Sequence, residues 1–471
     1  MLPASKNEAP FTQPEPAPAW RDELRDVLRL SLPAVGEQIL TMTVTLVNTI
    51  FVGHLGAASI TAVGLAGSLS FLASTFFAAV ATGATTLVAQ AVGARQHRLA
   101  QQTLEHSLAI GLLLGIISLV VMYPLATIGM CLMDAEEESV RLGALYLRWL
   151  SLSFPFQSVL LIGCGVLRGA GDTRTPMLLM GGMNVANLLL SYWLIRGGLG
   201  IAPLEVMGAG IAAFAATVLG CVAVLLTFAV PRSQLRLCAK KWSLNRQVLQ
   251  SVVAIGLPAG GEMLLFRLGF LAYSRAISSL GTTGYAAYLI TQRLEGLFDM
   301  PAFGFGVAAT TLVGQACGAE QPKQGHRAVF LAIGANLVWC LLTGPLIWIL
   351  AEPLLRLFTT DAEVIRQGLP LMRIIAVGLP VVAVASSFSG GIRGTGNTRA
   401  VMIVTGIGSW LLRVPLSFAS VGFLGWGLTG IQVTMFLDYA LRAILLAFLM
   451  RPRAWARQCR MGLRLGSNPH D

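Results

Sequence analysis

The sequence contains an internal repeat, and this repeat limits the possible folds more than any other feature. Residues 85–94 (TTLVAQAVGA) recur as residues 310–319 (TTLVGQACGA), and residues 168–174 (RGAGDTR) recur at the same offset as residues 393–399 (RGTGNTR). The register holds without a gap to about Gly197, beyond which the second copy is a few residues shorter. Chance similarity between apolar segments would not keep one register over such a length, so the chain consists of two related halves.

Both halves consist mainly of long apolar runs. The 471 residues are 55% hydrophobic and only 12% charged, with a mean hydropathy of +0.72, whereas soluble domains carry about 25% charged residues. About 20 apolar residues cross a bilayer as a helix, and the runs are continuous rather than alternating as in a transmembrane β-barrel. Twelve transmembrane helices are predicted, at residues 30–52, 60–92, 104–128, 143–166, 175–195, 208–230, 251–278, 284–316, 327–350, 367–392, 401–420 and 427–450.

The repeat and the number of spans together predict the architecture. Each copy has six crossings, and an even number returns the chain to its starting side, so both copies share one orientation. We expect an all-α integral membrane protein whose twelve transmembrane helices form two six-helix lobes related by a pseudo-two-fold axis along the membrane normal. The expected segments are a disordered cytoplasmic tail (1–27), an N-lobe (28–230), a basic cytoplasmic linker (231–249), a C-lobe (250–450) and a basic cytoplasmic tail (451–471).

The charges indicate how the chain is oriented. The formal net charge is +11, and the lysines and arginines lie mostly in alternate loops and in the C-terminal tail, whereas the loops at 134–138 and 361–363 are acidic. Basic loops stay in the cytoplasm, so we expect a plasma-membrane protein with both termini cytoplasmic and no nucleic-acid partner. The seven scattered cysteines contain no CxxC pair and predict neither a disulfide framework nor a metal site.

The repeated motifs resemble those of the multidrug and toxic compound extrusion (MATE) family. Leu-Pro-Ala occurs in the first and seventh predicted helices, residues 51–56 (FVGHLG) end the first, and residues 413–416 (RVPL) lie in the eleventh. The resemblance covers essentially residues 28–450. It implies a transporter rather than an enzyme: a monomeric antiporter that expels organic cations or other amphipathic compounds in exchange for H⁺ or Na⁺ by rocker-type alternating access. Its partners would be these small molecules and membrane lipids, and it would need no cofactor besides the coupling ion.

Acids that many family members use are replaced here, so the carboxylates of this chain are judged on local grounds. Asn48 stands where many prokaryotic members have aspartate, Ser191 where the fifth helix often has aspartate, and Phe266 where the seventh often has glutamate.

Glu37 and Glu262 are repeat equivalents within apolar helices and are candidates for proton or cation coupling. A charged group at the centre of a membrane helix costs about 2.5–3.5 kcal/mol on insertion scales, so it usually faces a cavity or a partner. Each glutamate follows a proline by four residues, and an ion pair near the cytoplasmic end of the helix is the alternative reading.

The C-half carries a surplus of buried charge. Glu295 and Asp299 lie one turn apart on one helix face, which suits a cation site and makes them further coupling candidates. Arg267, Arg275 and Arg293 are the expected ion-pair partners of these acids. Asp438 and Arg413 are expected to form a structural or gating pair.

Several other residues are candidates to line a substrate cleft. They are polar or flexible side chains within the apolar helices, for which interhelical hydrogen bonding or packing is the alternative role. The set is Asn48, Asn184, Asn187, Gln292, Met300 and Phe303.

Two other classes of function are weaker readings. A flippase for a lipid-linked glycan, from families of related architecture, would show more helices and a strongly cationic cavity. A membrane-embedded enzyme would need an acid or histidine cluster, whereas the five histidines are dispersed. No phosphate-binding loop of the form GxxxxGK[ST] occurs, which argues against ATP as the energy source.

Overall fold

The computed structural model describes residues 20–53, 55–133, 136–197, 202–230, 235 and 245–466. Within this part of the chain, twelve helical segments are long and apolar enough to cross a membrane. The predicted all-α architecture with twelve spans is therefore confirmed. The N-terminal six are α1 (Trp20–Gly53), α2 (Ala57–Gly93), α3 (His97–Cys131), α4 (Glu137–Gly169), α5 (Arg174–Arg196) and α6 (Glu205–Ala229).

The second half follows the same order. It comprises α7 (Arg246–Ser278), α8 (Gly281–Gly318), α9 (Pro322–Arg356), α10 (Ala362–Gly394), an eleventh span built from α11 (Thr398–Gly406), η2 (Ile407–Arg413) and α12 (Val414–Gly422), and the twelfth span α13 (Gly427–Leu449). An additional helix, α14 (Pro452–Gly466), follows the last span.

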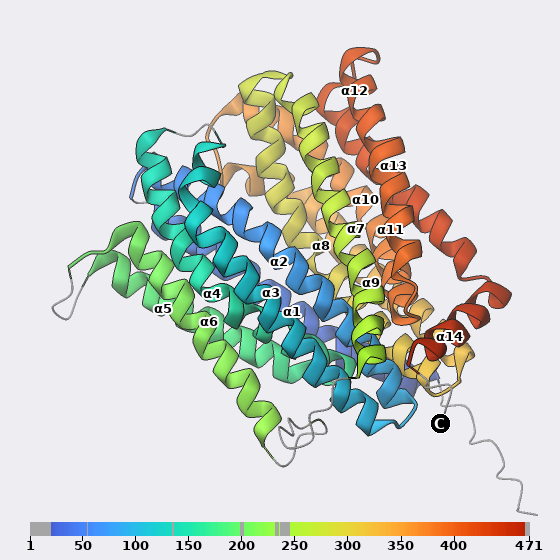
Figure 1. Ribbon diagram of the computed structural model, residues 1–471. Helices are drawn as coiled ribbons and strands as arrows, with labels where there is room; N and C mark the ends of the chain where they lie inside the picture. Colours follow the sequence, from blue (N-terminus) through green and yellow to red (C-terminus); the bar gives the residue numbers. More distant parts are fainter. Residues whose placement is uncertain are drawn as a thin grey trace, which may run out of the picture.

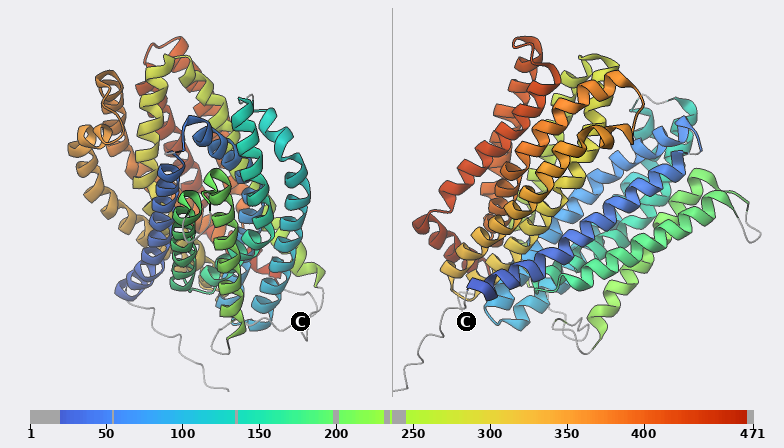
Figure 2. Two further views of the ribbon diagram at one scale, coloured as in Figure 1. Left: turned by 90° about the vertical axis from the view of Figure 1, so that its left-hand side faces the viewer. Right: turned by 180° about the vertical axis from the view of Figure 1, so that it is seen from behind.

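The helices form two bundles, α1–α6 (the N-lobe) and α7–α13 (the C-lobe), shown in Figures 1 and 2. Within the N-lobe, α2 packs on α4 and α3 on α4; in the C-lobe, α8 packs on α10 and α9 on α10. The lobes contact each other mainly through α1 against α8 and α2 against α7 and α8. The bundles approach each other at the end that carries the start of α1 and the helix α14, and they diverge at the other end (Figure 1). We call the first the basic end, because Arg98, Arg168, Lys323 and Arg393 lie there, and the second the acidic end.

The first helix begins earlier than predicted. Residues 20–27, expected to belong to a disordered tail, form the first turns of α1. Asp22 and Glu23 suit the positive N-terminal end of a helix dipole. Val27 is fully buried in a cluster with Phe305 and Ala309 of α8. The remainder of the expected tail, residues 1–19, and most of the expected linker lie outside the described residues.

The basic C-terminal tail contains a helix. Residues 452–466 form a helix, with Trp455 and Cys459 buried while Arg453, Arg457 and Arg460 are exposed. The Trp455 indole donates a hydrogen bond to the carbonyl of Pro322 (2.7 Å), and Cys459 is disulfide-bonded to Cys317 at the end of α8. This disulfide departs from the expectation that the scattered cysteines form none. Its two cysteines are 142 residues apart and meet only through the packing of α14 on α8.

The eleventh span contains a π-helical segment that its repeat equivalent, α5, lacks. The segment η2 covers Ile407–Arg413 and is followed by Pro415 inside α12. Pro415 has no amide hydrogen to continue the α-helical pattern, and π segments are frequent at functional sites. Ser409 and Arg413, both within η2, are buried.

Candidate functional site

The basic end is closed by hydrogen bonds that cross between the lobes in symmetric pairs. Gln90 of α2 donates to the carbonyl of Gly394 (3.1 Å), and its repeat equivalent Gln315 of α8 donates to that of Gly169 (3.3 Å). In the same way, Thr311 donates to the carbonyl of Arg168 (3.0 Å) and Thr86 to that of Arg393 (3.3 Å). The repeated motifs thus meet at the pseudo-two-fold axis, and we call these contacts the basic-end seal.

Two glycines allow the helices of the seal to touch. A Cβ atom added to Gly93 would overlap the backbone of Gln315, and one added to Gly318 would overlap the backbone of Gln90. The last turns of α2 and α8 therefore cross backbone to backbone, and a larger residue at either position would separate the lobes.

Glu37 and Glu262 each form an ion pair with an arginine whose backbone carbonyl accepts a hydrogen bond of the seal. Glu37 is 2.9 Å from Arg168, and Glu262 is 2.6 Å from Arg393. Glu262 also accepts a hydrogen bond from Thr405 (3.2 Å). The geometry therefore matches the ion-pair alternative for these two glutamates, at the level of the seal, and each carboxylate has its counter-charge beside it.

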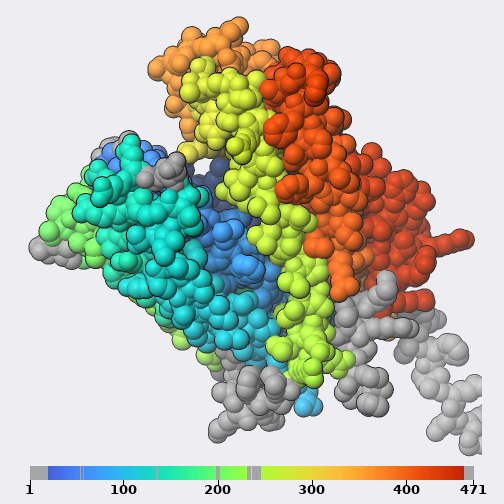
Figure 3. All heavy atoms as spheres, turned by 45° about the horizontal axis from the view of Figure 1, so that its top comes forward, coloured from blue at the N-terminus to red at the C-terminus, as the bar shows by residue number. Residues whose placement is uncertain are grey.

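Away from the seal the lobes separate and leave a cleft. On the α1–α8 side, a Cβ added to Gly304 would lie 2.9 Å from the Val35 amide nitrogen, whereas one added to Gly296, nearer the acidic end, would meet only the end of Met42 at 3.8 Å. On the other side, a Cβ added to Gly83 would overlap the backbone of Val252, whereas one added to Gly67 would meet no described residue within 4 Å outside its own helix backbone. Figure 3 shows the surface hollowed between the two lobes on the face that turns toward the acidic end.

A cluster of charged side chains is buried inside the C-lobe. Asp438 of α13 is fully buried and accepts two hydrogen bonds from Arg442 one turn later (2.7 and 2.6 Å). Arg413 of η2 lies 3.9 Å from Asp438 and stacks over the ring of Tyr273. The expected pair of Asp438 with Arg413 exists, but Arg442 is the closer partner.

Glu295 and Asp299 extend this cluster from α8. Both side chains are buried. Glu295 accepts hydrogen bonds from the side-chain amide of Gln432 (3.3 and 3.4 Å) and interacts electrostatically with Arg413. One oxygen of Asp299 is buried and has no hydrogen-bond partner among the described residues.

The formal charges of this C-lobe cluster do not cancel. Three carboxylates (Glu295, Asp299 and Asp438) face two guanidinium groups (Arg413 and Arg442). With all five groups ionised, the cluster carries a net charge of −1. Burying such an unpaired charge is costly. One oxygen of Asp299 belongs to this cluster and has no hydrogen-bond partner among the described residues.

The expected ion-pair partners differ from the observed ones. Arg267 stacks over Phe71 of α2 and Phe270 of α7, and Arg275 and Arg293 are exposed. Among the described residues, three buried carboxylates, Glu37, Glu262 and Asp438, are paired instead with arginines from other spans or from the same helix. The reason is direction: Arg267 and Arg293 project away from the C-lobe interior, while Glu295 and Asp299 project into it.

The expected cleft residues fall into two groups. Asn184 and Asn187 of α5 are buried against α1, where Asn184 donates to Thr41 (3.3 Å) and Asn48 donates to Asn187 (2.6 Å). These contacts match the alternative role stated for these residues, interhelical hydrogen bonding instead of lining a substrate cleft. On α8, Gln292 and Met300 are half-buried, and Phe303 is 51% exposed.

Several residues of the C-lobe cluster were not predicted from the sequence. Arg442 could have been found, because a basic residue four positions after a buried aspartate is a helical ion-pair spacing. Gln432, Ser409 and the hydrogen-bonded pair Tyr273 and Tyr288 carried no comparable signal.

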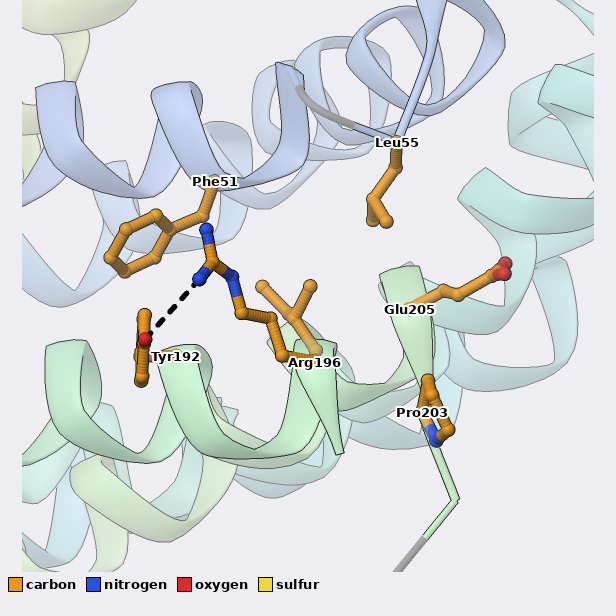
Figure 4. A pocket seen from close by; sticks show the side chains of 7 residues that line it. Phe51, Leu55, Tyr192, Arg196, Pro203 and Glu205 are labelled. Atoms are coloured by element: carbon orange, nitrogen blue, oxygen red, sulfur yellow. Dashed lines mark hydrogen bonds between the residues drawn. The ribbon is translucent and has the colours of Figure 1, made fainter. Parts of the chain in front are cut away.

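A separate small pocket lies in the N-lobe at the acidic end (Figure 4). The ends of α1 and α5 and the start of α6 form it, and Arg196 donates a hydrogen bond to Tyr192 there (3.2 Å). None of the predicted site residues lines this pocket.

Comparison with known proteins agrees with this architecture. The MatE family model matches residues 33–193 and 258–419, so its two matched segments begin at equivalent positions of the repeat. The chain is 32% identical over 451 residues to a probable multidrug resistance protein NorM from Thermotoga maritima, covering 94% of this chain and 95% of that one. It is 25% identical over 410 residues to the multidrug resistance protein PmpM from Pseudomonas aeruginosa, covering 86% and 85%.

Solved structures show the same fold. An outward-facing multidrug resistance MATE family transporter of the MOP superfamily superposes with a TM-score of 0.87 at 24% identity, covering 95% of this chain and all of that one. A MATE structure in complex with MaL6 gives a TM-score of 0.87 at 23% identity, covering 93% and 97%. With the family model matched in both halves, this chain belongs to the MATE family of membrane transporters.

Proposed function

We propose that this protein is a secondary active antiporter that exports amphipathic organic compounds in exchange for H⁺ or Na⁺. Two multidrug resistance relatives align over most of their length, which supports multidrug export. The basic end would face the cytoplasm with both chain termini, following the distribution of positive charge. The protein would act as a monomer in the plasma membrane, surrounded by lipid.

One observation carries the coupling role: the buried C-lobe cluster lacks one positive charge. Glu295, Asp299 and Asp438 face only two arginines, and one Asp299 oxygen has no partner among the described residues. A single proton or Na⁺ bound at Glu295 and Asp299 would neutralise the cluster. Release of that cation would restore the unpaired charge, so occupancy of the site would change the relative stability of C-lobe conformations.

Alternating access would follow from the two ends of the molecule. The seal holds the basic end shut while the cleft opens toward the acidic end. Transport would require the reverse arrangement, in which the seal opens and the acidic end closes. Because the seal consists of a few hydrogen bonds, each typically worth about 0.6 kcal/mol between membrane helices, it can be broken and re-formed.

The driving force is adequate without ATP. One positive charge entering down 100 mV supplies about 2.3 kcal/mol, and for a proton each pH unit adds about 1.36 kcal/mol. Together these support a roughly few-hundred-fold gradient of a neutral substrate per proton.

The test is export of the fluorescent cation rhodamine 123 from proteoliposomes under an imposed pH gradient and, separately, a Na⁺ gradient. We expect export under one gradient, and we expect Glu295→Gln and Asp299→Asn to abolish it while the proteins retain their elution profile in detergent. Glu352→Gln is the matched control, because Glu352 is half-exposed at the acidic end and, within the described part of the chain, forms an ion pair with Arg356 alone.

Gradient-driven export at the wild-type rate in both Glu295→Gln and Asp299→Asn would refute the coupling site. Export that ignores both gradients would refute antiport. The flippase alternative is not favoured, since the family and the relatives compared are transporters named for multidrug resistance.

A further inference from the structure

The cleft walls carry positive charge that no carboxylate neutralises. The walls are the four helices that face each other across the lobes, α1, α2, α7 and α8. Beyond the seal glutamate Glu37, α1 has no charged residue, and α2 has none at all. On α7 and α8, the acids are either paired in the seal or buried in the C-lobe cluster. Apart from Arg246 at the start of α7, this leaves Arg267, Arg275 and Arg293.

Arg267 points into the cleft from α7. Its guanidinium lies 5.2 Å from the centre of the Phe71 ring, and Phe71 belongs to α2 in the opposite lobe. The side chain of Phe71 is 44% exposed. Arg267 has no carboxylate within ion-pair distance among the described residues, and it stacks on two aromatic rings, to which a guanidinium is attracted electrostatically.

Arg293 points into the cleft from α8. Leu289, Leu297, Met300 and Phe303 share its face, which is exposed or half-buried along that stretch. Gly296, one turn from Arg293, faces Met42 of α1 across the cleft. Arg293 is exposed and forms no ion pair with the residues described.

The two arginines lie at matched depth. Arg267 stands about three helical turns before the end of α7 at Ser278, and Arg293 stands about three turns after the start of α8 at Gly281. At about 1.5 Å of rise per residue, both lie roughly 17 Å along their helices from the acidic end. The acids of the C-lobe cluster do not offset them, because Glu295 and Asp299 are buried on the other side of α8.

We infer that the cleft binds amphipathic compounds that carry an anionic group, a carboxylate or sulfonate, held by Arg267 and Arg293. The apolar part of the compound packs on Phe71, Phe303 and Met42. A guanidinium forms two parallel hydrogen bonds with a carboxylate, and an apolar wall beside it favours an aromatic body. This inference rests on the proposed export function and names its substrate class: zwitterionic or anionic amphiphiles in preference to simple cations.

The test uses one fluorophore with and without the carboxylate. Rhodamine 110 has a free carboxylate, and rhodamine 123 is its methyl ester. Binding to purified protein is measured by fluorescence anisotropy, which requires no transport. We expect rhodamine 110 to bind more tightly, and Arg267→Gln and Arg293→Gln each to weaken its binding about tenfold or more while changing the Kd of rhodamine 123 less than threefold.

The controls separate charge from packing. Arg356→Gln, at the acidic end and already paired with Glu352, should leave both dyes unaffected, and Arg267→Lys should restore part of the affinity for rhodamine 110. Equal weakening of both dyes, or tighter binding of the ester, would overturn the inference. Failure of gradient-driven export with the binding pattern intact would overturn the proposed function alone.

The anionic group could also belong to a phospholipid. Vesicles of phosphatidylcholine with and without phosphatidylglycerol distinguish the two sources. Unchanged rhodamine 110 affinity in both lipids supports a soluble amphiphile, and competition by phosphatidylglycerol that Arg267→Gln abolishes would overturn that assignment in favour of a lipid.

Discussion

The tightest contact between the lobes gives the sharpest prediction: Gly93→Ala should open the basic end. The last turn of α2 crosses the last turn of α8 there, and a Cβ at position 93 would overlap the carbonyl group of Gln315. The new methyl meets backbone rather than a flexible side chain, so rotamer changes cannot relieve the overlap. The lobes must move apart at the seal, which lengthens the hydrogen bonds of Gln90 and Gln315.

The expected magnitude follows from the cost of overpacking. Inserting a methylene-sized group into a tight contact costs typically about 1–3 kcal/mol. The cost falls only on the conformation with the seal closed, because the contact exists only there. At about 1.4 kcal/mol per factor of ten, the ratio of sealed to unsealed protein should fall by roughly 5- to 150-fold. Gly318→Ala should act equally, because its Cβ would meet Gln90 in the symmetric position.

The assay is a distance measurement by pulsed electron paramagnetic resonance. Spin labels replace Arg98 and Lys323, two exposed repeat-equivalent positions at the starts of α3 and α9, in a background without native cysteines. Gly93→Ala should add a population at longer distance across the basic end.

The matched control is Gly67→Ala on the same helix. An added Cβ there has nothing within 4 Å, and the only expected effect is the roughly 1 kcal/mol by which alanine favours a helix over glycine. Both conformations keep that helix, so the distance distribution should not move. If Gly93→Ala gives the same distribution as Gly67→Ala, the helix crossing is not what holds the basic end shut.

Two further predictions concern the seal and the C-lobe cluster. Thr86→Val with Thr311→Val removes one hydrogen bond on each side of the seal. At about 0.6 kcal/mol each, the ratio of sealed to unsealed protein should fall roughly sevenfold in the same distance measurement. Thr43→Val, which loses an intrahelical bond, should leave this ratio unchanged. Asp438→Asn removes the carboxylate that is hydrogen-bonded to Arg442 and lies 3.9 Å from Arg413. Breaking a buried ion pair in this way costs about 3–5 kcal/mol, so the Tm in detergent should drop by many degrees. A Tm equal to that of Glu363→Gln, an exposed pair with Arg366, would contradict the role given to Asp438.

The sequence was sufficient to predict the frame. Span positions follow from apolar length, and the two-lobed arrangement follows from a repeat with an even number of crossings. The partners of the seal glutamates could also have been inferred: a buried acid repeated at one offset requires a cation repeated at the same offset, and Arg168 and Arg393 meet that condition.

Other features depended on three-dimensional packing. The π segment in the eleventh span brings Arg413 toward Asp438 and places Gly408 where an added Cβ would overlap the Asp438 carboxylate. No local sequence pattern predicts a π-helical segment there. The sequence also could not predict whether the side chains of Arg267 and Glu295 point into the cleft or into the C-lobe. Helical spacing determines which residues share a face, but not which face lines the cleft. The helix α14, by contrast, could have been inferred, because Trp455 and Cys459 lie four residues apart among arginines, as on one face of an amphipathic helix.

The two lobes have the same arrangement of helices, but only the C-lobe contains a buried cluster of charged side chains. This difference bears on the mechanism. Ser70 and Ser74 of α2 occupy the repeat positions of Glu295 and Asp299, and α6 carries no charged residue after Glu205, where α13 has Asp438 and Arg442. The seal uses both halves equally, since closing one end of a two-lobed molecule requires equivalent contacts from each lobe. Coupling to one cation requires only one site, so a second buried acid cluster would add desolvation cost without further control. The symmetric residues should therefore set which end is open, and the asymmetric ones should set when that change occurs.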